Sequence, residues 1–327
     1  RNAMITSITV QNFRAFRDFT LGSLDRINLI AGKNNVGKTA LLEALFLYAN
    51  PGFKEWPPRL NFLRGFDRLE IDGMAKWGWV FRERDTKKTI SITSGDDRVE
   101  VAIIVDQEAV RFSHRNAQTA LGPVQQVNLF DGSRQPGQTT HSIPCGVFLG
   151  STAFSPQHVA EIYSTLELEG KQEAVVAALK TIDPRIQSLK VLYLGGIPMV
   201  YADVGLPPLI PIHQMGDGIV RLTSIVLEIA RAAGGIMLID EIENGIHYSA
   251  MEKVWSVIAE AARAANVQVF ATTHSWEAIV AAHEAFSHDA DYDFRLHRLD
   301  RQADDIQAVS FDKETLDTAI TMGLEVR

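Results

Sequence analysis

One segment constrains the fold of this 327-residue chain more than any other. Gly32-Lys33-Asn34-Asn35-Val36-Gly37-Lys38-Thr39 fits the pattern G-x-x-x-x-G-K-[ST] in full. The apolar run Ile27–Ala31 before it predicts a strand, and apolar residues recur at helical spacing from Thr39 to Tyr48 after it. A glycine-rich loop between a strand and a helix wraps its backbone around a phosphate, with the lysine on the terminal phosphates and the hydroxyl on magnesium. The sequence therefore predicts a nucleotide-binding α/β core.

The composition narrows the classes of protein that this core belongs to. With a single cysteine, Cys145, the chain forms no intramolecular disulfide and no cysteine-based zinc site. No apolar run approaches the roughly 20 residues that cross a bilayer, and the N-terminus lacks the apolar core of a signal peptide. Arg1-Asn2-Ala3 before Met4 has the character of a cloning scar, so we expect the natural chain to begin at Met4. These features predict a cytoplasmic protein with no membrane partner.

The predicted core is divided along the chain. Residues 4–49 hold its first half, with strands at 5–10 and 27–31, and residues 190–327 hold its second half. Between them, residues 50–189 are predicted to form an insertion, which is β-rich and antiparallel at first and helical around 156–179. The expected strands of the β-rich part are Trp77–Phe81, Thr89–Thr93, Val99–Val105 and Val110–Phe112.

Two buried strands in the second half end in polar side chains. Ile236–Ile239 is a continuous apolar run that leads into Asp240 and Glu241, and the run from Val267 to Thr273 leads into His274. At the carboxyl end of a parallel strand, Asp240 would hold magnesium and Glu241 would position and deprotonate a water. An imidazole at the same edge can hydrogen-bond the γ-phosphate or the attacking water.

Other segments of the second half complete the predicted elements. Gln214-Met215-Gly216-Asp217-Gly218 opens a helix, so its backbone amides form a second anion site. Ser249-Ala250-Met251-Glu252 has the pattern of a capping box before another helix. Strands are expected at 190–194 and 198–203, and a closing hairpin at 294–298 and 306–311.

In combination these segments resemble the ABC-type ATPase heads of the RecF/SMC/Rad50 group, most closely the OLD-like, or AAA15, branch. The matching segments, in chain order, are ITVQNFRAF at 8–16, GKNNVGKT at 32–39, QMGDG at 214–218, LIDEIENGIH at 238–247, ATTHS at 271–275 and the closing GLEVR at 323–327. The resemblance implies an α/β P-loop NTPase fold of the ABC-ATPase type. Its core sheet is mixed or parallel, with an N-terminal antiparallel β subdomain and a β-rich and helical insertion.

The resemblance also implies roles for single residues. ATP and Mg²⁺ are the expected cofactors, with Glu241 as general base and His274 as switch histidine. The metal would be held by Thr39, Asp240 and Gln157. The residues expected at the nucleotide are Arg14, Gly32, Asn34, Asn35, Val36, Gly37, Lys38, Thr39 and Ala40. Gly216, Asp217 and Gly218 form the signature of a second molecule in an ATP-sandwiched homodimer, where Asn244 and Gly245 of the D-loop cross the interface.

Two positions depart from the family pattern. Met215-Gly216-Asp217-Gly218 stands where transporter heads have a Ser-Gly-Gly core, so the γ-phosphate loses a hydroxyl and gains a neighbouring carboxylate. This substitution argues against fast hydrolysis. The Q-loop glutamine is assigned to Gln157, for which a plain surface glutamine is an equal alternative.

The sequence leaves the partner open. Asp289-Ala290-Asp291-Tyr292-Asp293 has the spacing of a TOPRIM nuclease pair, but the 34 residues that follow cannot build that domain, so an acidic loop is the preferred interpretation. The basic and aromatic segment 54–88 is either a DNA-contacting patch or a solvated edge of the insertion. We expect an ATPase that switches a DNA-bound or effector-bound state in DNA repair or antiviral defence. The alternative is a low-turnover nucleotide-dependent scaffold that controls a separately encoded effector, such as a nuclease or toxin.

Overall fold

The computed structural model describes residues 4–50, 78–95, 97–104, 109–115, 125–128, 134–135, 146–151, 155–289 and 291–327. The expected scar at 1–3, Cys145 and residues 54–77 of the basic segment lie outside the described residues. The chain forms two compact units. The first is made of Arg1–Asp25, Gly32–Gly146 and His297–Ser310, and the second of Arg26–Ala31, Val147–Leu296 and Phe311–Arg327. The predicted division into a split core and an insertion is a separate question and stays a prediction.

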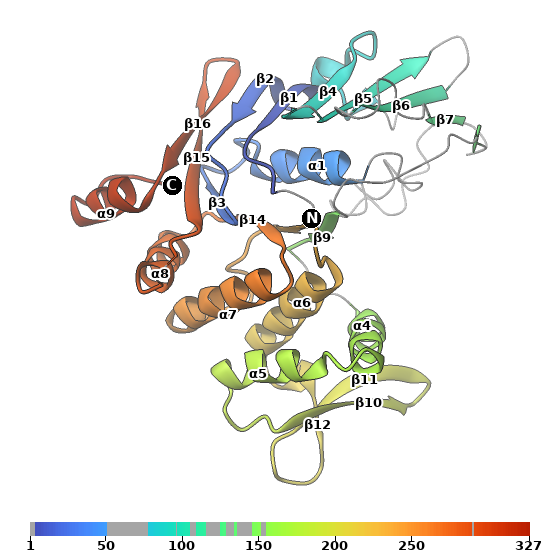
Figure 1. Ribbon diagram of the computed structural model, residues 1–327, viewed down its shortest axis with the longest axis vertical. Helices are drawn as coiled ribbons and strands as arrows, with labels where there is room; N and C mark the ends of the chain where they lie inside the picture. The colour runs from blue at the N-terminus through green and yellow to red at the C-terminus, as the bar shows by residue number, and fades with distance from the viewer. Residues whose placement is uncertain are drawn as a thin grey trace. The chain divides into compact units, whose positions relative to one another are not determined.

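A seven-stranded sheet with the strand order β2-β1-β4-β5-β6-β7-β8 builds the first unit (Figure 1). Its strands are β1 (Ile8–Phe13), β2 (Phe16–Leu21), β4 (Ile90–Ser94), β5 (Asp97–Ile104), β6 (Ala109–Arg115), β7 (Gln125–Asn128) and β8 (Arg134–Gln135). All neighbouring pairs are antiparallel. The predicted antiparallel β region is therefore confirmed. It continues the N-terminal hairpin directly, because β4 pairs with β1 at Thr9↔Thr93.

One expected strand of this unit is wrong. The described residues of 77–81 form a turn, and Phe81 makes only an isolated bridge to Phe13. The backbone amide of Arg14 donates to the carbonyl oxygen of Val80 at 2.9 Å. The segment therefore closes over the turn between β1 and β2 instead of pairing along a strand.

Helix α1 (Lys38–Ala49) follows the glycine-rich loop and confirms the predicted helix. All its residues from Ala40 to Ala49 are buried, and it packs on β4 and β5. The helix ends at Asn50, whose side-chain amide donates to the carbonyl oxygens of Phe46 and Gly146, both at 3.0 Å. The glycine-rich loop therefore leads into a helix that is buried from its third residue onward.

The second unit holds a run of parallel strands. β3 (Ile27–Ala31) pairs with β14 (Gln268–Thr272), and β14 pairs with β13 (Ile236–Ile239). Every side chain in these three strands is buried, as expected for strands covered on both faces. Since the strands are parallel, Ala31, Ile239 and Thr272 end at one edge of the sheet.

The complete sheet has the order β16-β15-β3-β14-β13-β9, with β9 (Gly146–Leu149), β15 (Phe294–Gln302) and β16 (Asp305–Phe311). The expected closing strands at 294–298 and 306–311 are confirmed as the neighbours β15 and β16. The structure therefore confirms an α/β fold with a mixed set of sheets.

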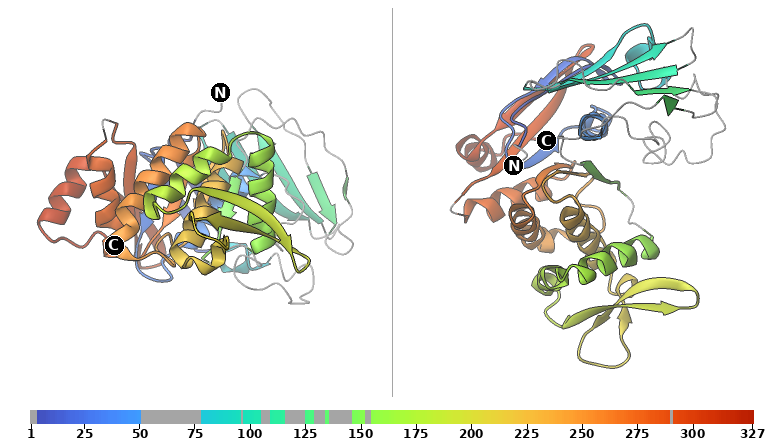
Figure 2. Two further views of the ribbon diagram at one scale, coloured as in Figure 1. Left: turned by 90° about the horizontal axis from the view of Figure 1, so that it is seen from below. Right: turned by 45° about the vertical axis from the view of Figure 1, so that its right-hand side comes forward.

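Helices and a small sheet complete the second unit (Figures 1 and 2). They are α4 (Pro156–Leu168), α5 (Gln172–Ile182), β10 (Ser188–Leu194), β11 (Ile197–Asp203), β12 (Ile210–Pro211), α6 (Asp217–Arg231), α7 (Met251–Ala264), α8 (Trp276–Ser287) and α9 (Lys313–Thr321). Helix α6 packs against α4, α5 and α7, and α4 also packs against β11. None of the helices in the described ranges is both long enough and apolar enough to cross a bilayer.

The expected capping box before α7 is wrong. Helix α7 begins after Ala250 with no side-chain cap, because Tyr248–Ala250 form a short 3-10 turn first. The hydroxyl of Ser249 hydrogen-bonds to Nδ1 of His247 at 2.9 Å instead. The helix is held by its buried face, where the indole of Trp255 donates to the carbonyl oxygen of Ala278 at 3.1 Å.

Candidate functional site

The glycine-rich loop in the first unit has a backbone that only glycine allows at two positions. Gly32 and Gly37 have φ angles of 146° and 114°. A Cβ at Gly32 would lie 2.7 Å from the carbonyl oxygen of Leu299, and one at Gly37 would lie 3.1 Å from Cδ1 of Ile306. The loop is therefore shaped by its close approach to β15 and β16, and it leads directly into the start of α1.

The side chains of this loop divide into two groups. Asn34 and Asn35 are exposed, whereas Val36 and Ala40 are buried, so the latter two can offer only backbone amides to a phosphate. Lys38 Nζ donates to the carbonyl oxygens of Gly32 at 2.6 Å and of Lys33 at 3.1 Å. The lysine is thus folded over the loop that precedes it. Thr39, the predicted metal ligand, is partly exposed in the first turn of α1.

Arg14 has a clear structural partner in the same unit. Its Nε lies 2.5 Å from Oε2 of Glu43, which is fully buried in α1. A buried carboxylate without a cation would be costly, so this ion pair stabilises the contact between the β1–β2 turn and α1. The predicted contact of Arg14 with a nucleotide stays a prediction.

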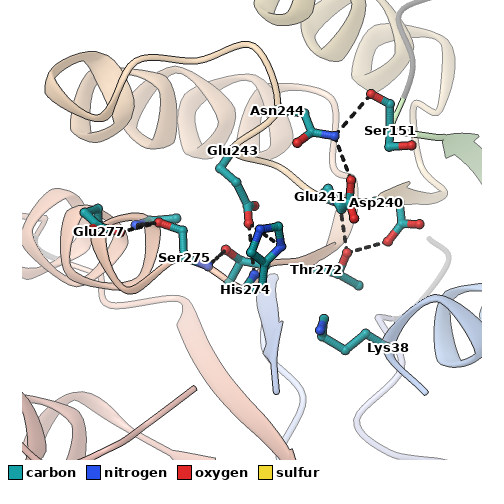
Figure 3. A network of polar contacts seen from close by, with 12 residues as sticks. Lys38, Ser151, Asp240, Glu241, Glu243, Asn244, Thr272, His274, Ser275 and Glu277 are labelled. Carbon is teal, nitrogen blue, oxygen red and sulfur yellow. Dashed lines mark hydrogen bonds and ion pairs between the residues drawn. The ribbon is translucent and has the colours of Figure 1, made fainter. Parts of the chain in front are cut away.

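In the second unit, the ends of β13 and β14 are tied together by one hydroxyl (Figure 3). Thr272 Oγ1 donates to Oδ1 of Asp240 at 2.5 Å and accepts from the backbone amide of Glu241 at 2.8 Å. Glu241 has a φ of 49°, a conformation that costs a residue other than glycine on the order of 1–3 kcal/mol. The chain therefore turns sharply after Asp240 and sends the two carboxylates in different directions.

The carboxylate of Glu241 is engaged by the D-loop. Asn244 Nδ2 donates to Oε2 of Glu241 at 2.7 Å and makes a longer contact of 3.4 Å with the carbonyl oxygen of Ser151. The structure thus brings together two residues that the sequence assigns to different motifs.

His274 also has a partner that the sequence does not assign. Its Nδ1 lies 3.1 Å from Oε1 of Glu243, and its backbone amide donates to the same oxygen at 2.9 Å (Figure 3). The Glu243 side chain is 12% exposed while that of His274 is 50% exposed. One carboxylate therefore fixes both the backbone and the ring of the predicted switch histidine.

The signature residues lie at the start of α6 and against the D-loop. Gly216 has a φ of 103° and precedes the first helical residue, Asp217, which is exposed. A Cβ at Gly245 would lie 3.2 Å from Cβ of Asp217, and one at Gly218 would lie 3.3 Å from the carbonyl oxygen of Gly245. The signature and the D-loop are therefore adjacent within one chain.

Gln157 stands apart from this arrangement as an exposed residue in the first turn of α4. Its neighbour His158 is the residue that reaches α6, with Nε2 at 2.8 Å from Oε1 of the buried Glu228. The predicted role of Gln157 as a metal ligand stays a prediction.

The acidic loop before β15 has a structural explanation. Arg263 donates from Nη1 to Asp289 at 2.8 Å and from Nε to Asp293 at 2.9 Å. Together the two carboxylates raise the pKa of Arg263 above its ordinary value, although partial burial opposes them. In the described part of the chain, no group of three or more His, Cys, Asp or Glu side chains is arranged to hold a metal.

Three residues of this region were not given roles from the sequence: Thr272, Glu243 and Arg221. Thr272 and Glu243 lie inside the quoted motifs, but a motif does not reveal which of its side chains bond to each other. Arg221 had a signal, since it is a charged residue between Val220 and Leu222 in a strongly apolar stretch of helix. It is 3% exposed.

Comparison with known proteins places these features in a family. The family described as "AAA domain, putative AbiEii toxin, Type IV TA system" matches residues 27–281. A protein of Helicobacter pylori named "ATP/GTP phosphatase" is 25% identical over 329 residues, which cover 84% of this chain and 86% of that protein. An uncharacterised protein of Methanocaldococcus jannaschii is 52% identical over 52 residues, covering 15% of this chain and 24% of its own length.

Solved structures share the fold. The Smc head bound to the C-winged helix domain of ScpA has a TM-score of 0.56 and 13% identity, covering 95% of this chain and 99% of that one. An Smc head with an extended coiled coil, bound to the C-terminal domain of ScpA derived from Pyrococcus furiosus, has a TM-score of 0.54 and 12% identity, covering 97% and 98%. The fold is therefore that of an SMC-type head.

Proposed function

Because this chain belongs to the AAA_21 family of AAA domains, whose match spans residues 27–281, we propose that it is a magnesium-dependent ATPase of the ABC and OLD-like type. The observation that carries the proposal is the shared edge of the parallel strands. Asp240 and Glu241 directly follow β13, and His274 lies two residues after the end of β14, at the edge where β3 leads into Gly32. The name of the Helicobacter pylori relative, "ATP/GTP phosphatase", supports nucleoside triphosphate hydrolysis.

In this proposal the residues divide the work as follows. The backbone amides of the glycine-rich loop and Lys38 bind the phosphates. Glu241 orients a water and accepts its proton, and His274, held by Glu243, contacts the γ-phosphate or that water. Asp217, which is exposed at the start of α6, contacts the nucleotide of a second molecule in this proposal.

The donor atoms suit magnesium. Mg²⁺ at nucleotide sites takes one or two protein oxygens and completes its octahedron with phosphate oxygens and waters. Asp240 offers a carboxylate at the strand end, and its Oδ1 is already oriented by the hydroxyl of Thr272. Thr39 offers a hydroxyl at the start of α1. Magnesium bound there would neutralise charge that develops on the phosphates.

The assembly that we propose is a homodimer with ATP between two heads. The signature loop Gln214–Gly218 opens a helix and is exposed at Asp217, as a surface that serves another molecule's nucleotide should be. The head structures with the same fold are bound to ScpA domains, which supports a separately encoded partner for this chain. We place the process in DNA repair or in defence against foreign DNA, and the toxin–antitoxin wording of the family description supports defence.

A direct experiment tests the activity and the assembly together. Purified protein is given ATP or GTP with Mg²⁺ or with EDTA, phosphate release is measured, and the molar mass is followed by light scattering. We expect Mg²⁺-dependent phosphate release and a shift from monomer to dimer with ATP, because the phosphate loop and the signature would close on the same nucleotide. Absence of phosphate release with either nucleotide, alone or with DNA, would contradict the ATPase assignment.

The low-turnover scaffold is a second candidate, and the hydrogen bond between Asn244 and Glu241 favours it. A hydrogen bond to a carboxylate contributes about 1.5–3 kcal/mol, so the amide of Asn244 would hold the Glu241 carboxylate in one orientation while the bond is made. In this alternative, ATP binding holds a partner inactive and hydrolysis is slow until the D-loop moves.

Replacing Asn244 with Ala distinguishes these candidates. If the amide restrains Glu241, we expect N244A to raise the turnover of the isolated protein about tenfold, the factor that 1.4 kcal/mol represents. Ser249→Ala, an exposed change a few residues along the chain, is the matched control and should leave turnover unchanged. A decrease in N244A would instead indicate that Asn244 acts in assembling the active dimer.

A further inference from the structure

Arg221 joins three separate segments of the second unit. It lies on α6, one turn after Asp217, and is 3% exposed. Its Nη1 donates to the carbonyl oxygen of Gly150 at 2.6 Å. Its Nη2 donates to the carbonyl oxygen of Asp240 at 2.7 Å and more distantly to that of Glu241 at 3.3 Å. The end of β9, the end of β13 and the first turns of α6 therefore meet at one guanidinium.

A buried guanidinium at this position costs free energy that an apolar side chain would not. Burial lowers the pKa of Arg221 to about 10, and the carboxylates of Asp240, Glu241 and Glu243 oppose that shift. An arginine side chain stays charged in proteins, and this one donates to backbone carbonyls. The neighbouring Leu222 is fully buried in the same helix without any such cost. What the arginine provides, and an apolar side chain cannot, is a planar set of N–H donors that fixes the positions of the backbone carbonyls.

Those carbonyls belong to the strained turn that presents Glu241. The positive φ of Glu241 is held on one side by Thr272, whose Oγ1 accepts a hydrogen bond from the backbone amide of Glu241 at 2.8 Å. On the other side, Arg221 donates hydrogen bonds to the carbonyl oxygens of Asp240 and Glu241. Without the guanidinium, these part-buried carbonyl oxygens would lose a hydrogen-bond donor, and the strained turn would be free to relax.

We propose that Arg221 is a positioning residue for Glu241, which fixes the turn after β13 against the first turns of the signature helix α6. The inference rests on the proposed function, because it treats Glu241 as the group that activates water. Arg221 is 3% exposed and donates to backbone carbonyls, so in this proposal it acts through the backbone of Glu241. It ties the backbone of the base to the helix whose N-terminus carries the signature, so that a shift of that helix changes where the base stands.

The test uses the full chain with Arg221→Met, Arg221→Lys and Arg221→Ala. A displacement of a catalytic group by about 1 Å costs on the order of 10²-fold in rate, so we expect R221M to lower kcat by about that factor. The Kd for a non-hydrolysable ATP analogue should stay close to that of the unaltered protein. R221K keeps the charge but loses the planar fork, and it should also lower kcat. Millimolar guanidinium chloride should restore part of the turnover of R221A, whereas NaCl should not.

Two controls separate positioning from general destabilisation. Ser224→Ala removes a buried hydroxyl of α6 that donates to the carbonyl oxygen of Val220 within the same helix, and this variant should keep its turnover. In a Glu241→Gln background, R221M should cause no further loss, because both changes act on the same step.

Normal kcat in R221M and R221K would overturn the inference. So would an R221M change that lowers kcat by the same factor in the unaltered protein and in the E241Q background. If R221M and R221A fail to fold, R221K decides the question by its kcat at unchanged Kd. The proposed function fails separately, through absence of phosphate release in the unaltered protein.

Discussion

Glu241→Gln is expected to lower ATP turnover by about 10³-fold, within the range of 10²–10⁴-fold that a positioned general base contributes. Gln keeps the shape of the side chain but cannot accept a proton from water. The substitution also removes a negative charge near the proposed phosphates, so ATP should bind at least as tightly. We therefore expect E241Q to accumulate as an ATP-bound dimer, measured by retained nucleotide and by light scattering.

The control for this prediction is Glu252→Gln, an exposed carboxylate at the start of α7. It removes the same charge from the chain without approaching the end of β13, and its turnover should be unchanged. If E241Q hydrolyses ATP at the normal rate, Glu241 is not the base. Glu243 would then be the next carboxylate to test, since it lies in the same turn and contacts His274.

Lys38→Ala is expected to abolish tight nucleotide binding. Removing one partner of a desolvated charge pair costs about 2–5 kcal/mol, which corresponds to a loss of roughly 30-fold to several thousand-fold in affinity. The substitution should raise Kd for ATP more than it lowers kcat, because the ammonium group binds the phosphates in both the ground state and the transition state. Titration calorimetry with ATP measures it directly.

Lys33→Ala is the matched control for Lys38, because it removes an exposed lysine from the same loop. It should weaken binding far less. The melting temperature must also be compared, since Lys38 bonds to the carbonyls of Gly32 and Lys33 in the resting loop. Normal ATP affinity in K38A would contradict the assignment of the loop as the phosphate site.

Elements with a strong local pattern were predictable from the sequence. The strand Ile236–Ile239 has the predicted bounds, and α1 and the pair β10 and β11 differ from prediction by a few residues. In each case an apolar pattern and a clear break define the element. Helices α8 and α9 were not predicted. Their caps are side-chain bonds, from Ser275 to the amide of Ala278 and from Asp312 to that of Thr315.

The wrong predictions are those in which distant backbone decides the local structure. The segment 77–81 has the composition of a strand, but the carbonyl of Val80 bonds to Arg14, which lies far away in the sequence. Ser249 has the right spacing for a capping box, but its hydroxyl bonds to His247. Neither competing partner is visible in a short window of sequence.

The candidate site was predictable as a set of motifs but not as a set of contacts. Spacing and strand patterns place Asp240, Glu241 and His274 at strand ends, and the parallel pairing of β13 with β14 brings those ends to one edge. Which side chains hydrogen-bond to one another depends on how their atoms are placed across that edge. This is why the bonds made by Thr272, Glu243 and Arg221 emerge only in three dimensions.

The close packing of Gly245 on Asp217 has a consequence for how this chain can change. A Cβ at Gly245 would meet Asp217 at 3.2 Å, and Gly245 already has a φ of 74°. A transporter-type signature grafted into positions 215–218 would therefore alter the volume available to the D-loop. The signature and the D-loop therefore share one packed contact, so a change of side chain at position 217 acts on both.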